Sequence, residues 1–285
     1  MFPGQGSQRK GMGKALFDRF PDEVGQVGEI LGYSLEKLCL ENPNRLLDET
    51  QYAQPAIFVV NALHHLERRR NGEPAPAYAI GHSLGEYNAL FAAEVFDFAT
   101  GVRLVKKRGE LMGRIGGGGM AAVVGLTRAE VAEALDAHGL TEQVDIANDN
   151  APTQVVISGP RQAVVAAKPL FEALPGGITC TVLRTSGAFH SRYMADARHR
   201  FEAYLAEHDF PFAPPKIPVL ANATAEAYDH SSVARNLVDQ ITAPVRWAET
   251  VRRLLDHGET EFTEVGTGRV LTSLLDRIRP AVAAG

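Results

Sequence analysis

The feature that most constrains the fold is a G-x-S-x-G sequence, Gly81-His82-Ser83-Leu84-Gly85, which directly follows the short apolar run Tyr78-Ala79-Ile80. A strand that ends in this motif and continues as a helix makes a sharp turn, and small residues around the serine tolerate its crowded backbone. The hydroxyl of Ser83 then stands above the edge of a sheet, and the backbone N–H of Leu84 faces a reacting carbonyl. The helix predicted over residues 86–95 adds its positive N-terminal dipole, which stabilises a developing oxyanion. The motif predicts a nucleophilic serine in an α/β fold; the alternative is a structural turn.

The order of the predicted elements indicates two structural units. Helical and strand-like patterns alternate along most of the chain, which is typical of a mixed α/β fold with a largely parallel sheet. After the glycine run 116–119, strands and helices are predicted in the order β-α-β-β-α-β of a ferredoxin-like unit. We therefore expect a large α/β-hydrolase-like subdomain, residues 1–116 and 187–285, with a small ferredoxin-like subdomain, residues 117–186, inserted in it. The expected helices cover 12–20, 35–40, 56–70, 86–95, 101–115, 128–137, 162–174 and 191–207, and the expected strands 78–80, 120–124, 144–147, 154–158, 178–183, 218–222 and 261–265.

Composition narrows the classes of function. Of the 285 residues, 45% are hydrophobic and 22% are charged, with a net charge of -5. These values are ordinary for a globular protein and give no sign of the broad basic surface that nucleic acid requires. Cys39 and Cys180 fit no metal-ligand or disulfide spacing and are expected to be buried thiols. With no signal-peptide pattern and no apolar run of about 18 residues, we expect a cytoplasmic protein that binds neither metal, membrane nor nucleic acid.

One histidine stands out as a base for the serine. His190 opens a predicted helix with an apolar face, so its ring is expected at the end of a buried surface whose entry is shaped by Gly187 and Phe189. A histidine in such a place is often only a satisfied core group, but a reactive serine needs a base, and we predict that His190 serves as one. His82 should point away from Ser83 at the sharp turn. The seven other histidines lie in polar surroundings and are expected at the surface: His64, His65, His138, His199, His208, His230 and His257.

Arg108 interrupts an apolar helix face. On the helix predicted over residues 101–115 it shares one face with leucine, methionine and isoleucine side chains, whereas the other charged residues lie mainly elsewhere. A buried guanidinium needs a carboxylate or a similar partner. Two interpretations are open: an internal salt bridge, for example with Glu86 or Asp97, or a binding site that grips a substrate carboxylate with two hydrogen bonds.

Gln5 is a further candidate. It lies in the turn Pro3-Gly4-Gln5-Gly6, which has little side-chain bulk and can approach an active site closely. A surface turn is the simpler interpretation of these residues alone.

Six short segments occur in this order along the chain: Phe2-Pro3-Gly4-Gln5-Gly6-Ser7-Gln8, Gly81-His82-Ser83-Leu84-Gly85-Glu86-Tyr87, Lys107-Arg108-Gly109, Gln154-Val155-Val156-Ile157-Ser158-Gly159, Ala188-Phe189-His190-Ser191 and Pro244-Val245-Arg246-Trp247. Together they closely resemble the malonyl-CoA:acyl carrier protein transacylases and the acyltransferase domains of polyketide synthases. The resemblance covers nearly the whole chain, and the combination of segments is highly specific. The chain is also similar to the freestanding acyltransferases that serve modular polyketide synthases lacking their own, with the disorazole-type enzyme as a close comparison.

The resemblance implies a role for each candidate. Ser83 would be the acylated nucleophile, His190 its base, and Arg108 the residue that binds the malonyl carboxylate. The side chain of Gln5 and the backbone N–H of Leu84 would form or border the oxyanion hole.

The resemblance also implies the surroundings of these groups. The backbone carbonyl of Gln240 would orient the catalytic histidine, and Asn148 and Asn150 would lie near the acyl-binding cleft between the subdomains. In this family Leu84 and Phe189 go with malonyl, whereas methylmalonyl enzymes tend to carry Gln and Ser at these positions. The chain departs from the family's pattern at two places. The family normally has a first strand ahead of Phe2. It also often has a bulkier residue at the position of Gly187, and the small size of this glycine is expected to widen the acyl pocket.

The implied reaction moves malonyl from malonyl-CoA to the phosphopantetheine thiol of an acyl carrier protein through a malonyl-serine, in polyketide or fatty acid biosynthesis. It would be a ping-pong exchange without metal, nucleotide or redox cofactor. Three alternatives fit less well. A proofreading acyl hydrolase of the same fold tends to lack the arginine, and a non-catalytic scaffold would not need Ser83 or His190. An unrelated serine esterase leaves Gln5, Arg108 and the inserted unit unexplained.

Overall fold

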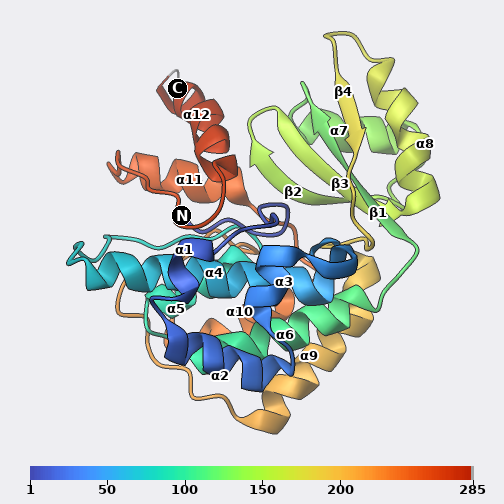
Figure 1. Cartoon of the computed structure of the whole chain (residues 1–285). Helices are drawn as coiled ribbons and strands as arrows, with labels where there is room; N and C mark the ends of the chain where they lie inside the picture. The colour runs from blue at the N-terminus through green and yellow to red at the C-terminus, as the bar shows by residue number, and fades with distance from the viewer. Residues whose placement is uncertain (284–285) are drawn as a thin grey trace.

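The chain folds into a large, mainly helical part and a smaller part built on a β-sheet, as the computed structural model of residues 1–283 shows (Figure 1). The chain leaves the large part after α6, forms the small part, and returns to the large part before α9. The helices of the large part are α1 Lys14–Phe17, α2 Pro21–Leu31, α3 Leu35–Glu41, α4 Thr50–Arg70, α5 Gly85–Ala92, α6 Phe98–Gly113, α9 Ala195–His208, α10 Val233–Asp239, α11 Trp247–Asp256 and α12 Val270–Ala283, with the 3₁₀ turns η1 Pro43–Asp48, η2 Arg192–Met194 and η3 His230–Ser232.

The small part is a four-stranded antiparallel sheet with two helices. Its elements have the predicted order β-α-β-β-α-β, and the strands lie side by side in the order β2-β3-β1-β4. The central pair, β1 and β3, is in regular register from Gly118 opposite Pro160 to Val124 opposite Gln154. Helix α8 packs on β1 and β4, and α7 on β2 and β3. The bounds are β1 Gly118–Val124, α7 Arg128–Ala137, β2 Asp145–Ala151, β3 Gln154–Pro160, α8 Arg161–Glu172 and β4 Thr179–Val182.

Local sequence explains how this part forms. Alternate side chains of β1, Ala121 and Val123, are buried in a core that the small part builds from its own residues. Helix α7 begins at a capping box: Thr127 Oγ1 accepts from the Glu130 backbone N–H, and the Glu130 carboxylate accepts from the Thr127 N–H. Gly117 has a φ of 78°, a conformation that favours glycine. The glycine run therefore marks the entry to the small part.

Among the described residues of the large part, parallel pairing is limited to single bridges. Phe2 is bridged to Gly81, and Ala79 to Val219, both in parallel orientation. The Val265 N–H donates to the Met1 carbonyl at 2.8 Å, so the predicted strands 78–80, 218–222 and 261–265 do lie beside one another or beside residues 1–2. They are too short to form regular ladders. The expectation of a largely parallel sheet is wrong in this respect, because the sheet of regular strands within residues 1–283 is the antiparallel one.

The helices differ from the predictions mainly at their ends. Helix α4 begins at Thr50 rather than residue 56, and α1 covers only Lys14–Phe17 of the predicted 12–20. Helix α2 was not predicted. It contains Gly25 and Gly28, each of which lowers helix propensity, while a proline in its first turn and burial of Val27 support it.

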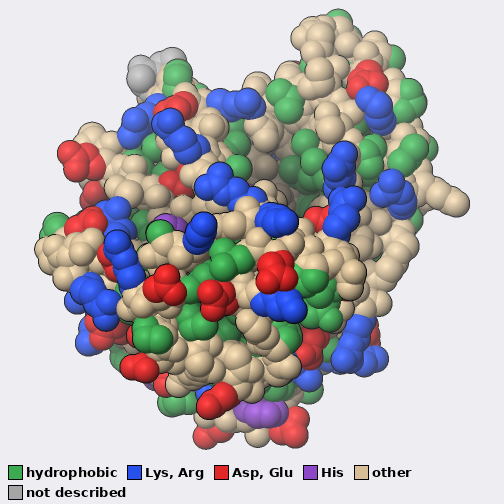
Figure 2. Space-filling view, viewed as in Figure 1, with side chains coloured by type: hydrophobic (Ala, Val, Ile, Leu, Met, Phe, Trp, Pro, Cys, Tyr) green, Lys and Arg blue, Asp and Glu red, His purple; other side chains and the backbone are tan. Residues whose placement is uncertain are grey.

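The two parts meet beside β2. The Asp149 N–H donates to the Val245 carbonyl at 2.9 Å, and the Val245 N–H donates to the Ala147 carbonyl at 2.8 Å. The Arg192 guanidinium binds the Asp145 carboxylate at 2.5 Å. Figure 2 shows that the surface is hollowed between the two parts and that Lys and Arg side chains lie around the hollow.

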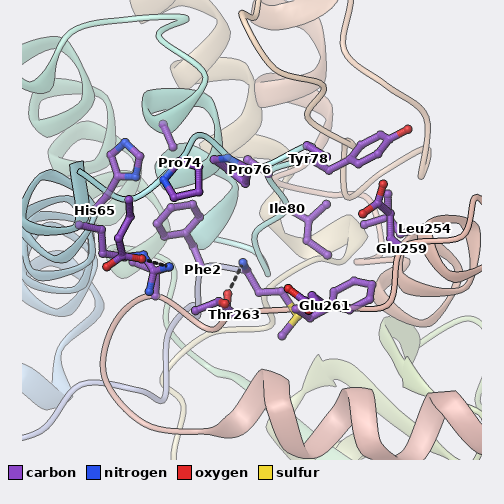
Figure 3. A pocket seen from close by; sticks show the side chains of 18 of the residues that line it. Phe2, His65, Pro74, Pro76, Tyr78, Ile80, Leu254, Glu259, Glu261 and Thr263 are labelled. Carbon is purple, nitrogen blue, oxygen red and sulfur yellow. Dashed lines mark hydrogen bonds and ion pairs between the residues drawn. The ribbon is translucent and has the colours of Figure 1, made fainter. Parts of the chain in front are cut away.

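A separate cavity of about 150 Å³ lies beside the N-terminal residue (Figure 3). The Met1 ammonium donates to the Thr263 carbonyl at 2.8 Å, and burial lowers its pKa to about 5. His65 lines this cavity and packs against Phe2 and Phe91. His65 and its neighbour His64 are therefore half-buried, and the prediction that they lie at the surface is wrong. None of the candidate site residues lines this cavity.

Two further predictions concern the cysteines and membrane-spanning helices. Cys39 and Cys180 are buried free thiols, as predicted, and burial raises the pKa of Cys39 to about 12. Across the described part of the chain, no helix combines the length and the apolar character needed to cross a membrane.

Candidate active site

Ser83 lies at a sharp turn between the extended segment 78–80 and helix α5. Its φ of 51° is in the left-handed region, which is uncommon for a residue with a side chain. A Cβ on Gly81 would lie 1.9 Å from the Gly85 carbonyl oxygen, and a Cβ on Gly85 would lie 2.0 Å from the Phe2 carbonyl oxygen. The two glycines are thus required by the close approach of backbones, and the predicted turn from an extended segment into a helix is confirmed.

Asn222 fixes this turn. Its Oδ1 accepts from the Ser83 N–H at 2.6 Å, and its Nδ2 donates to the Gly81 carbonyl at 2.7 Å. A non-glycine residue persists at positive φ only where its surroundings hold it there, and these two bonds do so on both sides of His82. Asn222 was not predicted as a site residue. The available signal was a polar residue at the end of the apolar segment 218–222.

Ser83 and His190 are in hydrogen-bond contact. The Ser83 Oγ lies 2.7 Å from His190 Nε2, and His190 Nδ1 lies 2.9 Å from the Gln240 carbonyl and 3.1 Å from the Ala243 carbonyl. Because carbonyl oxygens only accept, Nδ1 carries the proton and Nε2 is left with a free lone pair. The arrangement can therefore remove a proton from the serine hydroxyl, with a backbone carbonyl rather than an acidic side chain on the far side of the ring.

The environment keeps the His190 ring uncharged. The residue is 3% exposed, and burial, followed by the charge of Arg108 and by His82, lowers its pKa to about 3. At neutral pH the ring is therefore in the form that can accept a proton. His82 does not compete for the serine, since its Nε2 lies 2.7 Å from Asn150 Oδ1. The prediction that its side chain diverges from Ser83 is confirmed.

Arg108 is fully buried, at 1% exposure, and is held by amide oxygens. Its Nη1 donates to Gln54 Oε1 at 2.8 Å, and its Nη2 donates to Gln240 Oε1 at 2.9 Å and to Ser83 Oγ at 3.3 Å. Within residues 1–283 it forms no salt bridge, and its Nε has no hydrogen-bond partner. The first interpretation, a direct salt bridge with Glu86 or Asp97, is therefore wrong. Burial lowers the pKa of Arg108, and its charge is not neutralised by a carboxylate in contact.

A cavity of about 450 Å³ brings the candidate residues together. Ser83, His190 and Arg108 line it, as do Gln5, Asn148 and Phe189 among the predicted residues. Asn148 Oδ1 is buried without a partner among the described residues. Asn150 does not line the cavity and instead holds His82. The Leu84 side chain is fully buried and does not line it either.

The loop that carries Gln5 passes against the serine turn. A Cβ on Gly4 would lie 2.3 Å from the His82 carbonyl oxygen and 3.5 Å from the Leu84 nitrogen. The Gln5 side-chain amide donates a hydrogen bond to Thr50 Oγ1 at 3.2 Å, so one of its donors is directed away from Ser83. The backbone N–H groups of Gln5 and Leu84 form no hydrogen bond within the described residues. Two backbone donors are therefore available beside Ser83.

Gly187 does not widen the cavity as expected. A Cβ at this position would lie 2.5 Å from a ring carbon of Phe189, so the aromatic ring occupies the space that a larger residue 187 would fill. The glycine instead makes room for Phe189, which is 6% exposed and lines the cavity wall.

The site contains further buried polar residues that were not predicted to belong to it. Gln54 lies on α4 among apolar neighbours and binds Arg108, and Glu86, raised only as an ion-pair partner, lies within α5 at 0% exposure. A polar side chain on an otherwise buried helix was the signal that singled out Arg108. It was equally present at Gln54.

Comparison with known proteins places this geometry in context. Residues 1–278 match the model of the acyl transferase domain family. The polyketide biosynthesis malonyl CoA-acyl carrier protein transacylase PksC of Bacillus subtilis is 52% identical over 279 residues, which cover 98% of this chain and 96% of that protein.

Solved structures agree with the sequence match. A crystal structure of malonyl CoA-acyl carrier protein transacylase from Burkholderia pseudomallei superposes with a TM-score of 0.94 at 47% identity, covering 98% of this chain and 97% of that one. The malonyl-transacylase PlMCAT, solved in complex with AntF, a type II polyketide synthase acyl-carrier protein, superposes with a TM-score of 0.91 at 34% identity, covering 97% and 91%. The mixed α/β fold with its small antiparallel sheet is therefore shared with proteins of this kind.

Proposed function

Because the chain belongs to the acyl transferase domain family, we propose that it moves a malonyl group from malonyl-CoA to the phosphopantetheine thiol of an acyl carrier protein. One observation carries the proposal: the Oγ of Ser83 lies 2.7 Å from His190 Nε2 and 3.3 Å from Arg108 Nη2. A nucleophile, an uncharged base and a buried cation thus meet at one atom in one cavity. An acyl group that carries its own carboxylate fits this combination.

In the first half-reaction His190 Nε2 takes the hydroxyl proton as Ser83 Oγ attacks the thioester carbonyl. The developing oxyanion is stabilised by the free backbone N–H groups of Leu84 and Gln5, at the N-terminal end of α5. The sequence analysis assigned this role to the side chain of Gln5, but that side chain is bound to Thr50. The carbon–sulfur bond then breaks, and the coenzyme A thiolate takes the proton from His190 as it leaves.

In the second half-reaction the thiol of the carrier protein gives its proton to His190, and the thiolate attacks the malonyl-serine. The carbon–oxygen bond breaks and Ser83 recovers its proton from His190. The carbonyl groups of Gln240 and Ala243 keep Nδ1 protonated throughout. The His190 ring therefore alternates between its neutral and cationic forms by gaining and losing a proton at Nε2, without changing its tautomer. Both steps exchange a thioester and an ester, so these side chains suffice without a cofactor.

Arg108 selects the acyl group. Neutral amide oxygens hold the guanidinium in place without cancelling its charge, and the charge is worth more in a desolvated site than in water. A malonyl carboxylate supplies the missing anion, whereas an acetyl group leaves the cation unpaired. The same contact fixes the acyl group with its thioester carbon toward Ser83.

The names of the relatives support an acyl carrier protein as partner and polyketide biosynthesis as the setting. We infer a freestanding enzyme that serves a modular polyketide synthase. We also infer that residues 1–116 and 187–283 form an α/β-hydrolase-like subdomain and residues 117–186 a ferredoxin-like one, supported by the strand order β2-β3-β1-β4; the last two residues of the predicted range 187–285 lie outside the described part of the chain. The cytoplasmic location stays a prediction.

The proposed function is tested by incubating the protein with malonyl-CoA and a phosphopantetheinylated acyl carrier protein, and weighing the carrier by mass spectrometry. We expect malonyl-carrier with the wild type and none with Ser83→Ala above the uncatalysed background. Release of free malonate without malonyl-carrier would instead identify a hydrolase and contradict the proposal.

A further inference from the structure

The side chain of Gln240 connects the groups that the proposed reaction uses. Gln240 is 1% exposed. Its Nε2 donates to the Ser83 carbonyl at 2.8 Å and to a carboxylate oxygen of Glu86, while its Oε1 accepts from Arg108 Nη2 at 2.9 Å. Its backbone carbonyl accepts from His190 Nδ1. A change in the orientation of the side-chain amide would therefore act on the backbone of the serine turn and on the carboxylate-binding arginine, while the backbone carbonyl of the same residue holds the base.

Only one orientation of the Gln240 amide satisfies all its neighbours. The Ser83 carbonyl and an ionised Glu86 can only accept, whereas Arg108 can only donate. Rotating the amide by half a turn would place its single oxygen against two acceptors, the Ser83 carbonyl and the Glu86 carboxylate, and its NH₂ group against the guanidinium. On this basis we propose that Glu86 is a positioning residue: its carboxylate fixes the Gln240 amide with Oε1 toward Arg108, and so holds the guanidinium beside Ser83. The inference rests on the proposed function, because it concerns how the site binds a carboxylated acyl group.

Glu86 is itself held as an acceptor from every side. One of its oxygens accepts from the Asn222 backbone N–H at 3.1 Å and from the Tyr228 hydroxyl at 2.5 Å, and the other accepts from Gln240 Nε2. Burial raises the pKa of Glu86 to about 7, while the hydrogen bonds and the charge of Arg108 act in the opposite direction. The carboxylate lies in the first turn of α5, where the helix dipole favours a negative charge. In its ionised form Glu86 therefore places a negative charge near Arg108, separated from it by the Gln240 amide.

The substitution Glu86→Gln separates this role from simple packing, because it keeps the shape and removes one acceptor. A glutamine at position 86 has one oxygen, and the Asn222 backbone N–H cannot reverse its direction, so the oxygen must stay on that side. The new NH₂ group then faces the NH₂ of Gln240. To avoid two donors in contact, the Gln240 amide must rotate and turn its own NH₂ toward Arg108. The guanidinium loses an acceptor and is pushed from its place.

The experiment measures kcat/KM for malonyl-CoA and acetyl-CoA, with one carrier protein, on the wild type and Glu86→Gln. We expect the malonyl-to-acetyl ratio to fall about 10- to 150-fold, the equivalent of one hydrogen bond to a charged group. The loss should fall mainly on malonyl. Val164→Ala is the control: Val164 is fully buried in the core of the small part, so this variant loses stability without touching the network and should keep the ratio.

A second variant covers the case in which Glu86→Gln does not fold. The exchange Glu86→Gln with Gln240→Glu returns a donor–acceptor pair to the two positions but places a carboxylate directly on Arg108. The exchange also removes the donor to the Ser83 carbonyl, so its stability is measured alongside. We expect it to have lost the malonyl preference, since the guanidinium is already paired. A wild-type ratio in either folded variant overturns the positioning role. A wild type without any malonyl preference contradicts the proposed function itself, so the two failures are distinct.

Discussion

Replacing Arg108 with alanine isolates the contribution of the buried cation to selectivity. The side chain is 1% exposed and touches Ser83 Oγ through Nη2, so the substitution removes a charge from within reach of the reacting atom. Gln54 and Gln240 lose a hydrogen-bond donor but remain neutral. The buried Glu86 carboxylate loses a nearby cation but keeps its hydrogen bonds to Asn222, Tyr228 and Gln240. The effect of the substitution on transfer should therefore fall on carboxylated substrates.

The magnitude follows from the surroundings of the guanidinium. It lies in a desolvated site, and amide oxygens rather than carboxylates contact it. Loss of one member of a buried, hydrogen-bonded charge pair costs roughly 2–5 kcal/mol. At about 1.4 kcal/mol per factor of ten, this corresponds to a malonyl-over-acetyl preference of about 30- to several-thousand-fold. Arg108→Ala should remove most of that preference by lowering malonyl transfer.

The assay compares kcat/KM for malonyl-CoA and acetyl-CoA with one carrier protein. Arg103→Ala is the matched control, because Arg103 lies on the same helix α6 but is exposed. The control should keep the wild-type ratio. An unchanged malonyl-to-acetyl ratio in Arg108→Ala would refute the reasoning and place the carboxylate site elsewhere.

Three further predictions concern the turn and the base. The pKa of histidine, 6.5 in the unfolded chain, falls to about 3 in folded His190, so between these values the unfolded chain binds more protons and the folded state loses stability as the pH falls. The free energy of urea unfolding of the wild type, relative to that of His190→Ala, should fall by about 1.4 kcal/mol between pH of about 7.5 and 5.5. A difference that does not vary with pH would contradict the buried neutral ring. Gly85→Ala should prevent native folding because its Cβ would lie 2.0 Å from the Phe2 carbonyl oxygen, whereas Gly25→Ala, on a helix with open space around it, should stabilise the fold by about 0.5–1 kcal/mol. Equal melting temperatures of the two variants would argue against the tight turn. Asn222→Ala should cost about 1–3 kcal/mol in urea unfolding by leaving a buried N–H unpaired and should slow acylation of Ser83, and a wild-type burst with this variant would show that the turn holds itself.

Much of the site could be predicted because its signals are local. The G-x-S-x-G motif places Ser83 through backbone sterics alone, the apolar helix faces singled out His190 and Arg108, and the resemblance chose between the two interpretations of Arg108. The resemblance also named the backbone carbonyl of Gln240 as the partner of His190, but Asn222 and the role of the Gln240 side chain were not predicted. Asn222 and Gln240 meet the serine turn across 139 and 157 positions of sequence, and nothing local distinguishes a buried glutamine that orients an arginine from one that is exposed.

In the fold, too, features set by local sequence were predicted, and those set by distant contacts were not. The small part was predicted element by element, because the glycine run before it and the local sequence patterns of its strands and helices mark each element; the structure adds a capping box at Thr127. The extended segments of the large part were predicted at the right positions, but the regular parallel sheet that they were expected to form is not present in residues 1–283. Segments such as 78–80 make single bridges to neighbours far along the chain, so their pairing depends on the helices around them. Helix α2 was missed because burial of Val27 and Leu31 outweighs the low propensity of its two glycines.

The central claim is that Ser83 carries the acyl group. The most direct measurement is intact-protein mass spectrometry of the wild type and Ser83→Ala after incubation with malonyl-CoA, followed by peptide mapping of any adduct. We predict one malonyl group on the wild type, mapped to Ser83 and discharged when a phosphopantetheinylated carrier protein is added, and an unmodified Ser83→Ala variant. A stable malonyl adduct on Ser83→Ala, or a wild-type adduct on another residue that the carrier protein discharges, would contradict it.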